Sequence, residues 1–344
     1  MKRLVILAPN WLGDAVMALP AIADVRRAAP AASIAVAARA SVAPLFALVS
    51  DVDETIVLRR VPLSVAAWHE LGVEIAGKGF DTALLLPNSV NAALLAGRAG
   101  IPNVWGYRTD WRGRFLTRAI TPASGLHQVE SYQHLVRALG FANGPSEPRV
   151  TVTADARETA RALLISTGWD PAVPLVAIAP GAAYGGAKRW PPEYFAELVN
   201  GLAADGVQCV MVGTAADAET GASVERSAKA SRSIVNLVGR TDLSALAGVL
   251  ANCRALVTND SGAMHLAAAI GIQVTAMFGP TNEHATSPGT PNPDSRVPNP
   301  DSRTTVLTHP VWCRPCMLRE CPLDHRCMRG IDVETVLEAA RSRL

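Results

Sequence analysis

Short apolar runs alternate with amphipathic stretches along the chain, and this alternation constrains the fold more than any other feature of the sequence. In the first half, apolar runs of strand length cover residues 4–8, 33–38, 54–58 and 82–86. Apolar residues at helical spacing cover residues 15–28, 66–76 and 92–99. Strands that alternate with helices are typical of a parallel sheet with helices on both faces. The first half therefore predicts an α/β, doubly wound domain.

The same alternation restarts in the second half. Strand-like runs cover residues 175–179, 208–212, 255–258 and 273–278, and helical patterns cover residues 157–166, 193–204, 243–252, 262–270 and 333–343. The periodicity between the halves is interrupted by Pro145, Pro148, Pro171 and Pro174. A chain of 344 residues fits two domains of about 150 residues each. We therefore expect one domain at 1–160, a second at 161–330 and a C-terminal helix within 331–344.

The composition excludes several classes of protein. Apolar residues make up 49% and charged residues 18%, which is typical of a globular chain. A net charge of +2 and an aromatic content of 5% argue against a nucleic-acid partner. The apolar run that follows Lys2 and Arg3 is shorter than a signal-peptide core, and no run of 18 apolar residues occurs. We expect a cytoplasmic protein that can still touch a membrane surface.

Two common nucleotide-binding loops are missing. The turn after the first strand, residues 9–14, has one glycine where a dinucleotide fingerprint needs three, which weakens a dehydrogenase interpretation. The glycine-rich stretch 181–188 partly matches the sequence pattern of a P-loop, but its lysine stands one place too late and no Ser or Thr follows it. Phosphates, if they are bound, must be held in another way.

Asp14 follows Gly13 where the first strand gives way to a helix. One interpretation is a helix cap, because an aspartate satisfies free backbone N–H groups at a helix N-terminus. The other is a general base, because a carboxylate at the carboxyl edge of a parallel sheet faces the ligand cleft. The residues alone leave both interpretations open.

A glycine-rich stretch with two cations follows the first strand of the second half. Gly181 begins this stretch, and Lys188 and Arg189 stand near its end, just before Pro191. Glycines let backbone N–H groups approach an anion, and the cations add positive charge beside it. The competing interpretation is a solvated basic loop ahead of a helix that has proline in its first turn.

A third motif lies where the strand at 255–258 meets the next helix. The free N–H groups of a helix N-terminus bind anions, and a diphosphate is a suitable ligand. Asp260 is expected to orient Lys188 or to contact a donor sugar. His265, one turn into the helix, fits a packed core histidine as well as a ligand. The residues of this motif that would form the anion site are Asp260, Ser261, Gly262, Ala263 and Met264.

Taken together, these motifs resemble the lipopolysaccharide heptosyltransferase family, most closely its heptosyltransferase II branch. The resemblance rests on residues 11–14, 180–191, 257–265 and 278–281 and extends to the cysteine-rich segment 313–327. It covers nearly the whole chain. It implies two Rossmann-like domains that face a central cleft, the GT-B glycosyltransferase fold, in which a C-terminal helix often packs back on the first domain.

The resemblance also implies a reaction. The donor would be ADP-L-glycero-D-manno-heptose, the acceptor heptosyl-Kdo-lipid A at the inner face of the inner membrane, and the transfer would invert the anomeric carbon. Asp14 corresponds to the catalytic base, and Lys188 corresponds to the residue that neutralises the leaving diphosphate. Gly181, Arg189 and the stretch 260–264 correspond, together with Lys188, to the donor site.

The chain departs from the family pattern at two places. Ala183 stands where members of the family often carry an acidic residue. The sequence Pro-Asn-Pro-Asp-Ser-Arg at 291–296 recurs at 298–303, and its composition predicts a mobile surface loop. We infer no function from this tandem repeat.

A basic stretch of the first domain is the candidate for the anionic acceptor. Two tryptophans, Trp105 and Trp111, stand within or beside it. We hypothesise that the stretch meets Kdo carboxylates, phosphates or the membrane face; the alternative is a solvated basic loop or helix. The arginines of this stretch are Arg108, Arg112, Arg114 and Arg118, of which the first three are our candidate acceptor-binding residues.

Six cysteines fall into two groups. Cys209 and Cys253 stand alone in apolar surroundings and are expected to be buried. The other four are Cys313, Cys316, Cys321 and Cys327, with His309 and His325 close by. Their spacing permits a zinc site but is compressed for a common zinc module, and reduced thiols or disulfides formed on isolation are the alternatives. No Asp-x-Asp pair lies in a suitable turn, so we expect no obligatory metal in catalysis and no other cofactor.

Three competing functions remain at this stage. Heptosyltransferases I and III would use the same donor on another core acceptor, and the cysteine segment favours II. A non-catalytic ADP-heptose-binding protein would need no base at the position of Asp14. A nicotinamide-dependent oxidoreductase fails because the glycine fingerprint is missing.

Overall fold

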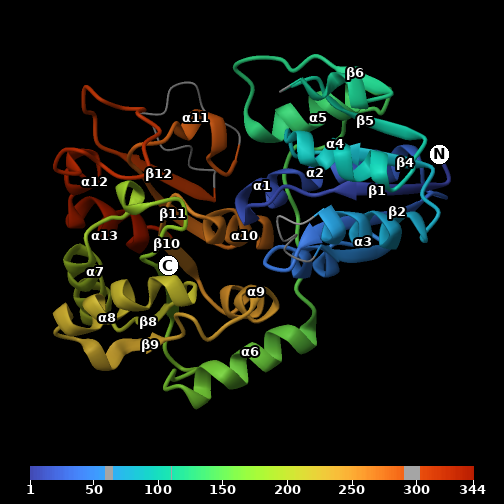
Figure 1. The fold of residues 1–344 in the computed structure, drawn as a ribbon. Helices are drawn as coiled ribbons and strands as arrows, with labels where there is room; N and C mark the ends of the chain where they lie inside the picture. The colour runs from blue at the N-terminus through green and yellow to red at the C-terminus, as the bar shows by residue number, and fades with distance from the viewer. Residues whose placement is uncertain (59–64, 110, 290–302) are drawn as a thin grey trace. The chain divides into compact units, whose positions relative to one another are not determined.

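The structure is a computed structural model that describes residues 1–58, 65–109, 111–289 and 303–344. These residues form two compact units, Met1–Arg149 and Val150–Leu344 (Figure 1). Each unit is an open parallel sheet with helices on both faces.

The first unit is built on a six-stranded sheet with the strand order β3-β2-β1-β4-β5-β6. Its strands are β1 (Arg3–Leu7), β2 (Ser33–Arg39), β3 (Glu54–Leu58), β4 (Thr82–Leu85), β5 (Asn103–Tyr107) and β6 (Arg118–Ile120). All the pairings are parallel; in the centre, Val5 of β1 is aligned with Ala35 of β2 on one side and with Ala83 of β4 on the other. The last four of the five residues of β1 are buried because helices cover both faces of the sheet.

The helices of the first unit pack in pairs. They are α1 (Leu12–Met17), α2 (Leu19–Ala28), α3 (Val65–Ala76), α4 (Val90–Arg98) and α5 (Gln128–Ala138), with 3-10 turns η1 (Ala43–Leu48) and η2 (Arg112–Phe115). Helix α2 packs against α5, and α3 packs against α4. The apolar spacing over 15–28 predicted one helix, but the chain forms two that meet at Ala18. Pro20 lacks a backbone N–H and its ring crowds the carbonyl of Val16, which interrupts the helix.

The second unit repeats the architecture with the strand order β12-β11-β10-β7-β8-β9. Its strands are β7 (Leu175–Ala179), β8 (Gln208–Met211), β9 (Ile234–Asn236), β10 (Ala255–Asn259), β11 (Gln273–Phe278) and β12 (Thr304–Thr308). In both units the strand order reverses between the first and fourth strands, which are β1 and β4 in one and β7 and β10 in the other. Ligands of such sheets bind beyond the carboxyl ends of the strands at this reversal.

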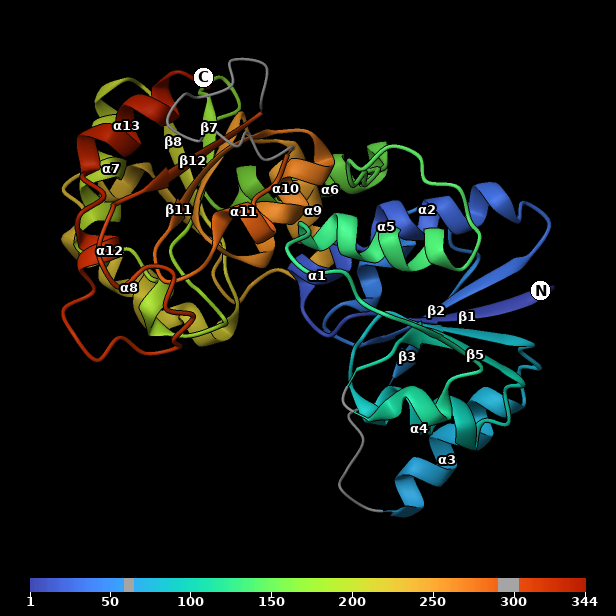
Figure 2. The same ribbon diagram turned by 90° about the horizontal axis from the view of Figure 1, so that it is seen from above.

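The helices of the second unit include the C-terminal one. They are α6 (Ala154–Ser166), α7 (Pro192–Ala204), α8 (Ala218–Ser227), α9 (Leu243–Ala251), α10 (Gly262–Ile270), α11 (Glu283–Thr286), α12 (Arg326–Arg329) and α13 (Val333–Arg341), with 3-10 turns η3 (Gly186–Lys188), η4 (Ala215–Asp217) and η5 (Ser231–Ser233). Helix α13 packs against α7 and β11 of its own unit (Figure 2). A Cβ at Gly201 of α7 would meet Leu337 of α13 at 2.5 Å, so the two helices approach closely.

The two units divide between Arg149 and Val150, whereas the sequence pattern placed the boundary at residue 160. The difference is helix α6, which packs along α9. A Cβ at Gly248 of α9 would lie 2.6 Å from the carbonyl oxygen of Ala156, so this glycine allows α6 to lie close against α9. The packing places all of α6 in the second unit. The sequence pattern did not show this, because the prolines before α6 are typical of a linker between domains.

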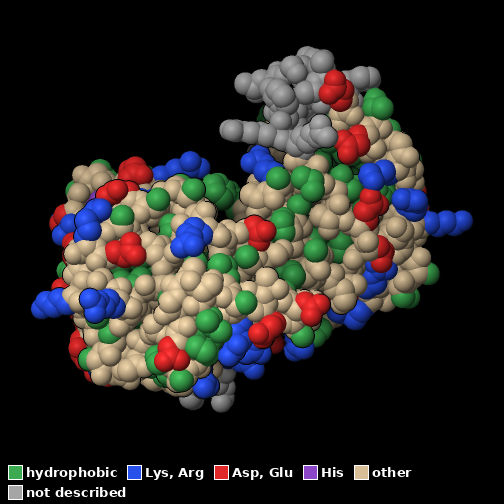
Figure 3. Space-filling model, turned by 90° about the horizontal axis from the view of Figure 1, so that it is seen from below, with side chains coloured by type: hydrophobic (Ala, Val, Ile, Leu, Met, Phe, Trp, Pro, Cys, Tyr) green, Lys and Arg blue, Asp and Glu red, His purple; other side chains and the backbone are tan. Residues whose placement is uncertain are grey.

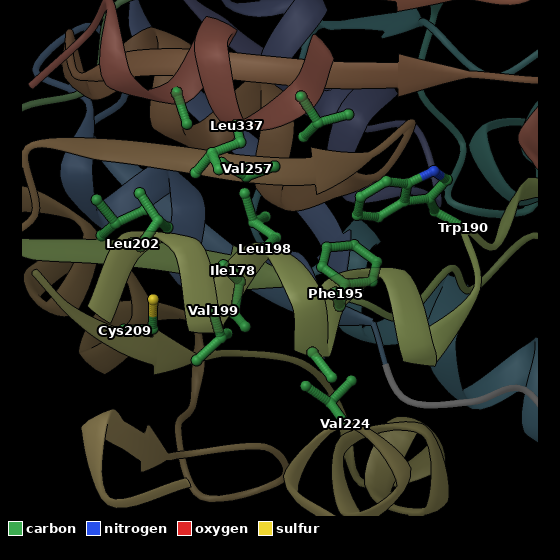
Figure 4. Packing of buried hydrophobic residues seen from close by; sticks show 14 of the residues in the cluster. Ile178, Trp190, Phe195, Leu198, Val199, Leu202, Cys209, Val224, Val257 and Leu337 are labelled. Carbon is green, nitrogen blue, oxygen red and sulfur yellow. The ribbon is translucent and has the colours of Figure 1, made fainter. Parts of the chain in front are cut away.

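The core of the second unit lies between α7, α13 and the sheet (Figure 4). Trp190 is fully buried there, with its ring edge-on to the rings of Phe195 at 5.0 Å and Tyr194 at 5.5 Å. Cys209 lies in the same core, and Cys253 is also buried, as predicted. Burial raises the pKa of the Cys209 thiol to about 12 because the thiolate would lose its hydration.

The surface carries charges of both signs. Figure 3 shows Lys and Arg side chains interspersed with Asp and Glu on one face, consistent with the net charge of +2. Among the described residues, no helix is both long enough and apolar enough to cross a membrane. The tandem repeat at 291–303 lies outside the described residues except for Arg303.

Candidate active site

Two buried residues hold the glycine-rich loop at the carboxyl end of β7. The ring N–H of Trp190 donates to the carbonyl of Ile331 at 2.9 Å, and its backbone N–H donates to Oδ1 of Asn259 at 3.0 Å. The side-chain amide of Asn259 donates to the carbonyls of Pro180 at 2.9 Å and Gly181 at 3.2 Å. Asn259 therefore ties the loop after β7 to the end of β10. The sequence analysis placed Asn259 only inside a motif and missed this role.

Lys188 and Asp260 form an ion pair between the two loops that follow β7 and β10. Nζ of Lys188 lies 2.5 Å from Oδ2 of Asp260, and the side chains are 12% and 7% exposed. Oγ1 of Thr281 donates to the same carboxylate oxygen at 2.7 Å. A nearly buried cation at the strand-order reversal is well placed to meet an anionic ligand. The two side chains that the sequence analysis expected to interact are therefore in contact, and Thr281 adds a partner that it did not single out.

Gly181 and Arg189 both lie beside Asp217, at the end of η4. A Cβ at Gly181 would lie 2.2 Å from the carboxylate carbon of Asp217, so this position accepts only glycine without a shift of its neighbour. The carboxylate accepts hydrogen bonds from the backbone N–H of Thr214 at 3.0 Å and from its hydroxyl at 2.8 Å. The guanidinium of Arg189 lies 3.6 Å from the same carboxylate. Asp217 therefore shapes the loop from the side of β8.

Helix α10 begins directly after the Lys188–Asp260 pair. Ser261 is its N-cap residue, and Gly262 and Ala263 supply backbone N–H groups in the first turn. Donors of this kind bind anions. The side chain of Met264 is fully buried, so its part in such a site is limited to the backbone. His265 is also buried, at 6% exposure.

In the first unit, Asp14 lines a cavity of about 290 Å³ at the carboxyl ends of β1, β4 and β5. Asp14 is the third residue of α1, and the N-cap residue of that helix is Trp11, so the expectation that Asp14 caps the helix is wrong. From its position in the first turn of α1, Asp14 lines the cavity. Other polar residues that line the cavity are Asn10, Asn88, Gln128, Ser131 and Tyr132.

Two tyrosines line this cavity, Tyr132 from α5 and Tyr107 from the end of β5. Tyr132 is 6% exposed, and burial raises the pKa of its phenol, with a further contribution from the negative charge of Asp14. The hydroxyl of Tyr107 donates to the carbonyl of Ser131 at 2.5 Å and lies 2.9 Å from Nδ1 of His134. Burial raises the pKa of Tyr107 as well. Both phenols therefore stay protonated and act as hydrogen-bonding groups at neutral pH.

Arg112 differs from the expectation for an acceptor-binding residue. Its side chain is 0% exposed, and the guanidinium donates to the carbonyl of Tyr107 at 2.8 Å, to the carbonyl of Pro87, and to Oδ1 of Asn88 at 3.3 Å. These groups belong to the walls of the Asp14 cavity. Arg112 is therefore a structural support of the cavity, and its charge is not presented to solvent. The sequence analysis erred because exposed and buried arginines look alike in a basic stretch.

Arg108 and Arg114 are exposed, as an acceptor-binding role requires. The guanidinium of Arg114 lies over the ring of Phe115 at 4.9 Å. Trp111 stands between the two arginines in the chain, is 92% exposed and has φ of +61°. A non-glycine residue in this left-handed region is uncommon. The turn therefore presents one large apolar ring and two cations to solvent.

The C-terminal cysteines are half-buried or buried. Cys313, Cys316 and Cys321 are half-buried, Cys327 is buried, and all of them are free thiols. Among the described residues, no three or more His, Cys, Asp or Glu side chains are arranged to hold a metal ion. Burial raises the pKa of Cys327.

Comparison with known proteins identifies the family. The model of glycosyltransferase family 9 (heptosyltransferase) matches residues 68–326. The chain belongs to this family. The lipopolysaccharide heptosyltransferase 2 of Salmonella typhimurium is 32% identical over 300 residues, which cover 83% of this chain and 85% of the relative. The protein of the same name from Escherichia coli is 31% identical, with the same coverage.

Solved structures of family 9 members have the same fold. E. coli ADP-heptose lipopolysaccharide heptosyltransferase II matches with a TM-score of 0.83 and 29% identity, covering 99% of this chain and 98% of that one. A family 9 glycosyltransferase of Veillonella parvula matches with a TM-score of 0.86 and 23% identity, covering 99% and 96% of the two chains. The predicted fold class and the predicted family are confirmed. The chain is a glycosyltransferase.

Proposed function

We propose that this family 9 protein transfers L-glycero-D-manno-heptose from ADP-heptose to heptosyl-Kdo-lipid A, in the assembly of the lipopolysaccharide inner core. The observation that carries the proposal is that Asp14 lines a polar cavity at the strand-order reversal of the first unit. The corresponding reversal of the second unit carries the Lys188–Asp260 pair and a helix N-terminus. One unit thus offers a carboxylate for an acceptor hydroxyl, and the other offers cationic and N–H groups for a diphosphate.

In the proposed reaction Asp14 acts as the general base. The acceptor hydroxyl oxygen forms a bond to the anomeric carbon of the donor while the bond from that carbon to the phosphate oxygen breaks. The hydroxyl proton passes to the carboxylate of Asp14, and ADP leaves with the bonding electron pair. A single displacement of this kind inverts the anomeric carbon. Tyr132 and Gln128, which line the same cavity, supply polar groups for the acceptor sugar.

Lys188 and the first turn of α10 form the proposed donor site. Negative charge grows on the diphosphate as the glycosidic bond breaks, and an ammonium group held in place stabilises that charge most in the transition state. Asp260 holds the ammonium of Lys188 before the ligand arrives, and Thr281 fixes the Asp260 carboxylate by donating to the same oxygen. Gly181, Arg189, Ser261, Gly262, Ala263 and the backbone of Met264 complete the site.

We also propose that the protein works in the cytoplasm at the inner face of the inner membrane. The exposed turn with Arg108, Trp111 and Arg114 supports this, because a tryptophan flanked by arginines suits an interface of anionic headgroups. The two arginines would meet Kdo carboxylates or phosphates of the acceptor. The Arg108→Ala and Arg114→Ala double variant should raise the acceptor KM and leave the donor KM unchanged; an equal rise in both KM values would contradict this role.

The decisive experiment measures ADP release from ADP-heptose with and without heptosyl-Kdo-lipid A. Wild type should release ADP only when the acceptor is present, and Asp14→Asn should lower kcat by about 10²- to 10⁴-fold, the range for a general base. Calorimetry should show that ADP-heptose still binds to the variant. Asp51→Asn, in the loop before β3, is the matched control and should retain full activity.

Other outcomes identify the competing functions. Turnover only with Kdo-lipid A that lacks heptose would assign the protein to heptosyltransferase I activity. Tight ADP-heptose binding without turnover on any core acceptor would indicate a non-catalytic binding protein. Full activity of Asp14→Asn would remove Asp14 from the reaction.

A further inference from the structure

Residues 313–321, which we call the cysteine segment, pack against both loops of the proposed donor site. The segment follows β12 and precedes α12, and it contains three of the four C-terminal cysteines. Its neighbours are residues 279–283, which we call loop 279–283 and which run from the end of β11 to the first residue of α11, and the glycine-rich loop 181–188 after β7. Its role is not explained by the cavity in the first unit or by the metal interpretation of its cysteines.

One set of contacts joins the segment to loop 279–283. Nε of Arg314 donates to the carbonyl of Gly279 at 2.7 Å, and its terminal NH2 group donates to Oε2 of Glu283 at 2.8 Å. The Arg314 and Glu283 side chains are only 12% and 16% exposed, so water weakens this ion pair less than a surface pair. The backbone N–H of Met317 donates to the carbonyl of Pro280 at 2.9 Å.

A second set joins the segment to the glycine-rich loop. The hydroxyl of Tyr184 donates to the carbonyl of Met317 at 2.8 Å, and the backbone N–H of Ala187 donates to the carbonyl of Arg319 at 2.9 Å. The N–H of Gly186 donates to Oε1 of Glu320 at 3.0 Å. The bonds of Gly186 and Ala187 are made by the loop backbone, so they fix the path of the loop and not only its side chains.

Close packing explains a glycine in this loop. A Cβ at Gly185 would lie 2.2 Å from the carbonyl oxygen of Arg319, a backbone atom that cannot move aside on its own. The glycine therefore permits the segment to approach the loop within hydrogen-bonding distance.

The two loops converge on one carboxylate oxygen. Loop 181–188 carries Lys188 and loop 279–283 carries Thr281, and both side chains bond to Oδ2 of Asp260, at 2.5 and 2.7 Å. The ring of Tyr184 also lies 4.7 Å from Nζ of Lys188 and 5.3 Å from the guanidinium carbon of Arg319. The cysteine segment is thus linked at both ends to the groups that place the ammonium of Lys188.

We propose that the cysteine segment is a positioning element of the donor site: Arg314 of the segment, and Tyr184 of the loop that the segment contacts, act on the diphosphate through Lys188. The link to the diphosphate rests on the function proposed above; the coupling of the two loops does not. Groups that orient a ligand-binding side chain from behind it typically change affinity and rate without touching the ligand. Arg314 and Tyr184 are therefore positioning residues and not catalytic ones.

The first test needs no ligand. Hydrogen exchange of the whole protein, read by mass spectrometry, compares wild type with Arg314→Met. We expect faster exchange in loop 279–283 and also in loop 184–188, at the N–H groups of Gly186 and Ala187, which Arg314 does not touch. Exchange that rises only in loop 279–283 would overturn the proposal. Arg226→Met, which removes an exposed ion pair of the same unit and the same 2.8 Å length, should change neither loop.

The second test separates positioning from general stability. Arg314→Met should weaken ADP binding about tenfold, the loss expected when a charged group leaves hydrogen-bonding range, while AMP binding changes less than about twofold because AMP lacks the second phosphate. Tyr184→Leu should behave likewise, and Tyr184→Phe, which keeps the ring over Lys188, should lie between it and wild type. Equal losses for ADP and AMP, or a lower melting temperature with unchanged affinities, would overturn the proposal.

The two tests also keep this inference apart from the proposed function. If wild type binds neither ADP nor AMP, the donor assignment fails, and the exchange experiment still decides whether the segment couples the loops. If wild type binds ADP and the Arg314→Met protein binds it equally well, the positioning role fails while the donor assignment stands.

Discussion

Nζ of Lys188 lies 2.5 Å from Oδ2 of Asp260, although the two residues are 72 positions apart in the chain. Both side chains are nearly buried, at 12% and 7% exposure. Removing ions from water is costly, and such a pair often contributes little net stability. The pair lies in the two loops that follow the central strands β7 and β10, and it is the centre of the donor site proposed above.

Replacing Lys188 with methionine keeps most of the length of the side chain and removes its charge. We expect kcat for ADP-heptose transfer to fall by about 10²- to 10³-fold, as for the loss of one preorganised group that stabilises developing charge. Steady-state kinetics with saturating acceptor measure the effect. Lys229→Met, at an exposed lysine of the same unit, is the control and should leave kcat unchanged. A loss below threefold for Lys188→Met would exclude the proposed role.

Gly181→Ala places a methyl group 2.2 Å from the carboxylate carbon of Asp217. We expect a loss of about 1–3 kcal/mol in the free energy of unfolding, the usual cost of overpacking, together with weaker ADP binding. Urea denaturation checks the first effect. In an Asp217→Ala background the cost of Gly181→Ala should shrink, because the clash is gone; an undiminished cost would show that the clash is not its cause.

Gly97→Ala is the matched control for this substitution. Gly97 lies in α4, and among the described residues nothing comes within 4 Å of a Cβ built there. We expect the Gly97→Ala substitution to stabilise the protein by about 0.5–1 kcal/mol, because alanine loses less backbone entropy than glycine when the helix forms.

Asp53 makes the stability of the first unit depend on pH. The backbone N–H of Ile34 donates to its carboxylate at 2.7 Å and Arg26 does so at 2.6 Å, and these bonds lower its pKa below 3.8 in spite of some desolvation. Because the folded pKa is lowered, the carboxylate stabilises the fold fully above pH 3.8, and this contribution disappears as the pH falls through the folded pKa.

Asp53→Asn should therefore lower the free energy of unfolding at pH 7 by about 0.5–1 kcal/mol, a small value because the side chain is half-exposed. The difference between variant and wild type should narrow below pH 3.8. Chemical denaturation at pH 7 and at a series of acidic pH values tests this. A difference in the free energy of unfolding that does not change with pH would indicate that the negative charge of Asp53 does not contribute to stability.

The cysteines should differ sharply in reactivity. Burial raises the pKa of Cys209 to about 12 and raises that of Cys253 as well, so neither thiol forms a thiolate at pH 8. Alkylation of the native protein at pH 8, followed by peptide mass spectrometry, should modify Cys316 and Cys321 and leave the two buried thiols untouched. Protection of Cys316 and Cys321 that ends with a chelator would reveal zinc, and protection that ends with a reductant would reveal disulfides.

Periodicity alone determined most of the fold. The strand runs at 175–179 and 273–278 and the helix at 262–270 have the bounds that the structure shows. The two strands are mostly apolar along their whole length because both faces of a parallel sheet are buried. The pattern missed β5, β6, β9 and β12, which are edge strands or next to an edge and carry fewer buried residues. A strand with few buried positions needs few apolar residues, so its sequence shows only a weak apolar pattern.

The sequence also determined which segments carry the residues of the proposed site. Asp14, Lys188 and Asp260 each stand in the connection or the first helical turn that follows a predicted strand, and parallel strands bring their carboxyl ends to one edge of a sheet. Their residue types, read with the family motifs, were enough to predict a glycosyltransferase. Local order along the chain was sufficient for these conclusions.

Only the tertiary structure decided the partners of these residues. Arg112 and Arg114 are two positions apart, yet one guanidinium is buried against backbone carbonyls and the other is exposed. Asn259 and the cysteine segment hold the loops of the proposed donor site through contacts that span 79 and 134 positions of the chain. Burial and hydrogen bonding depend on which distant segments pack together, and no local spacing of residues records that packing.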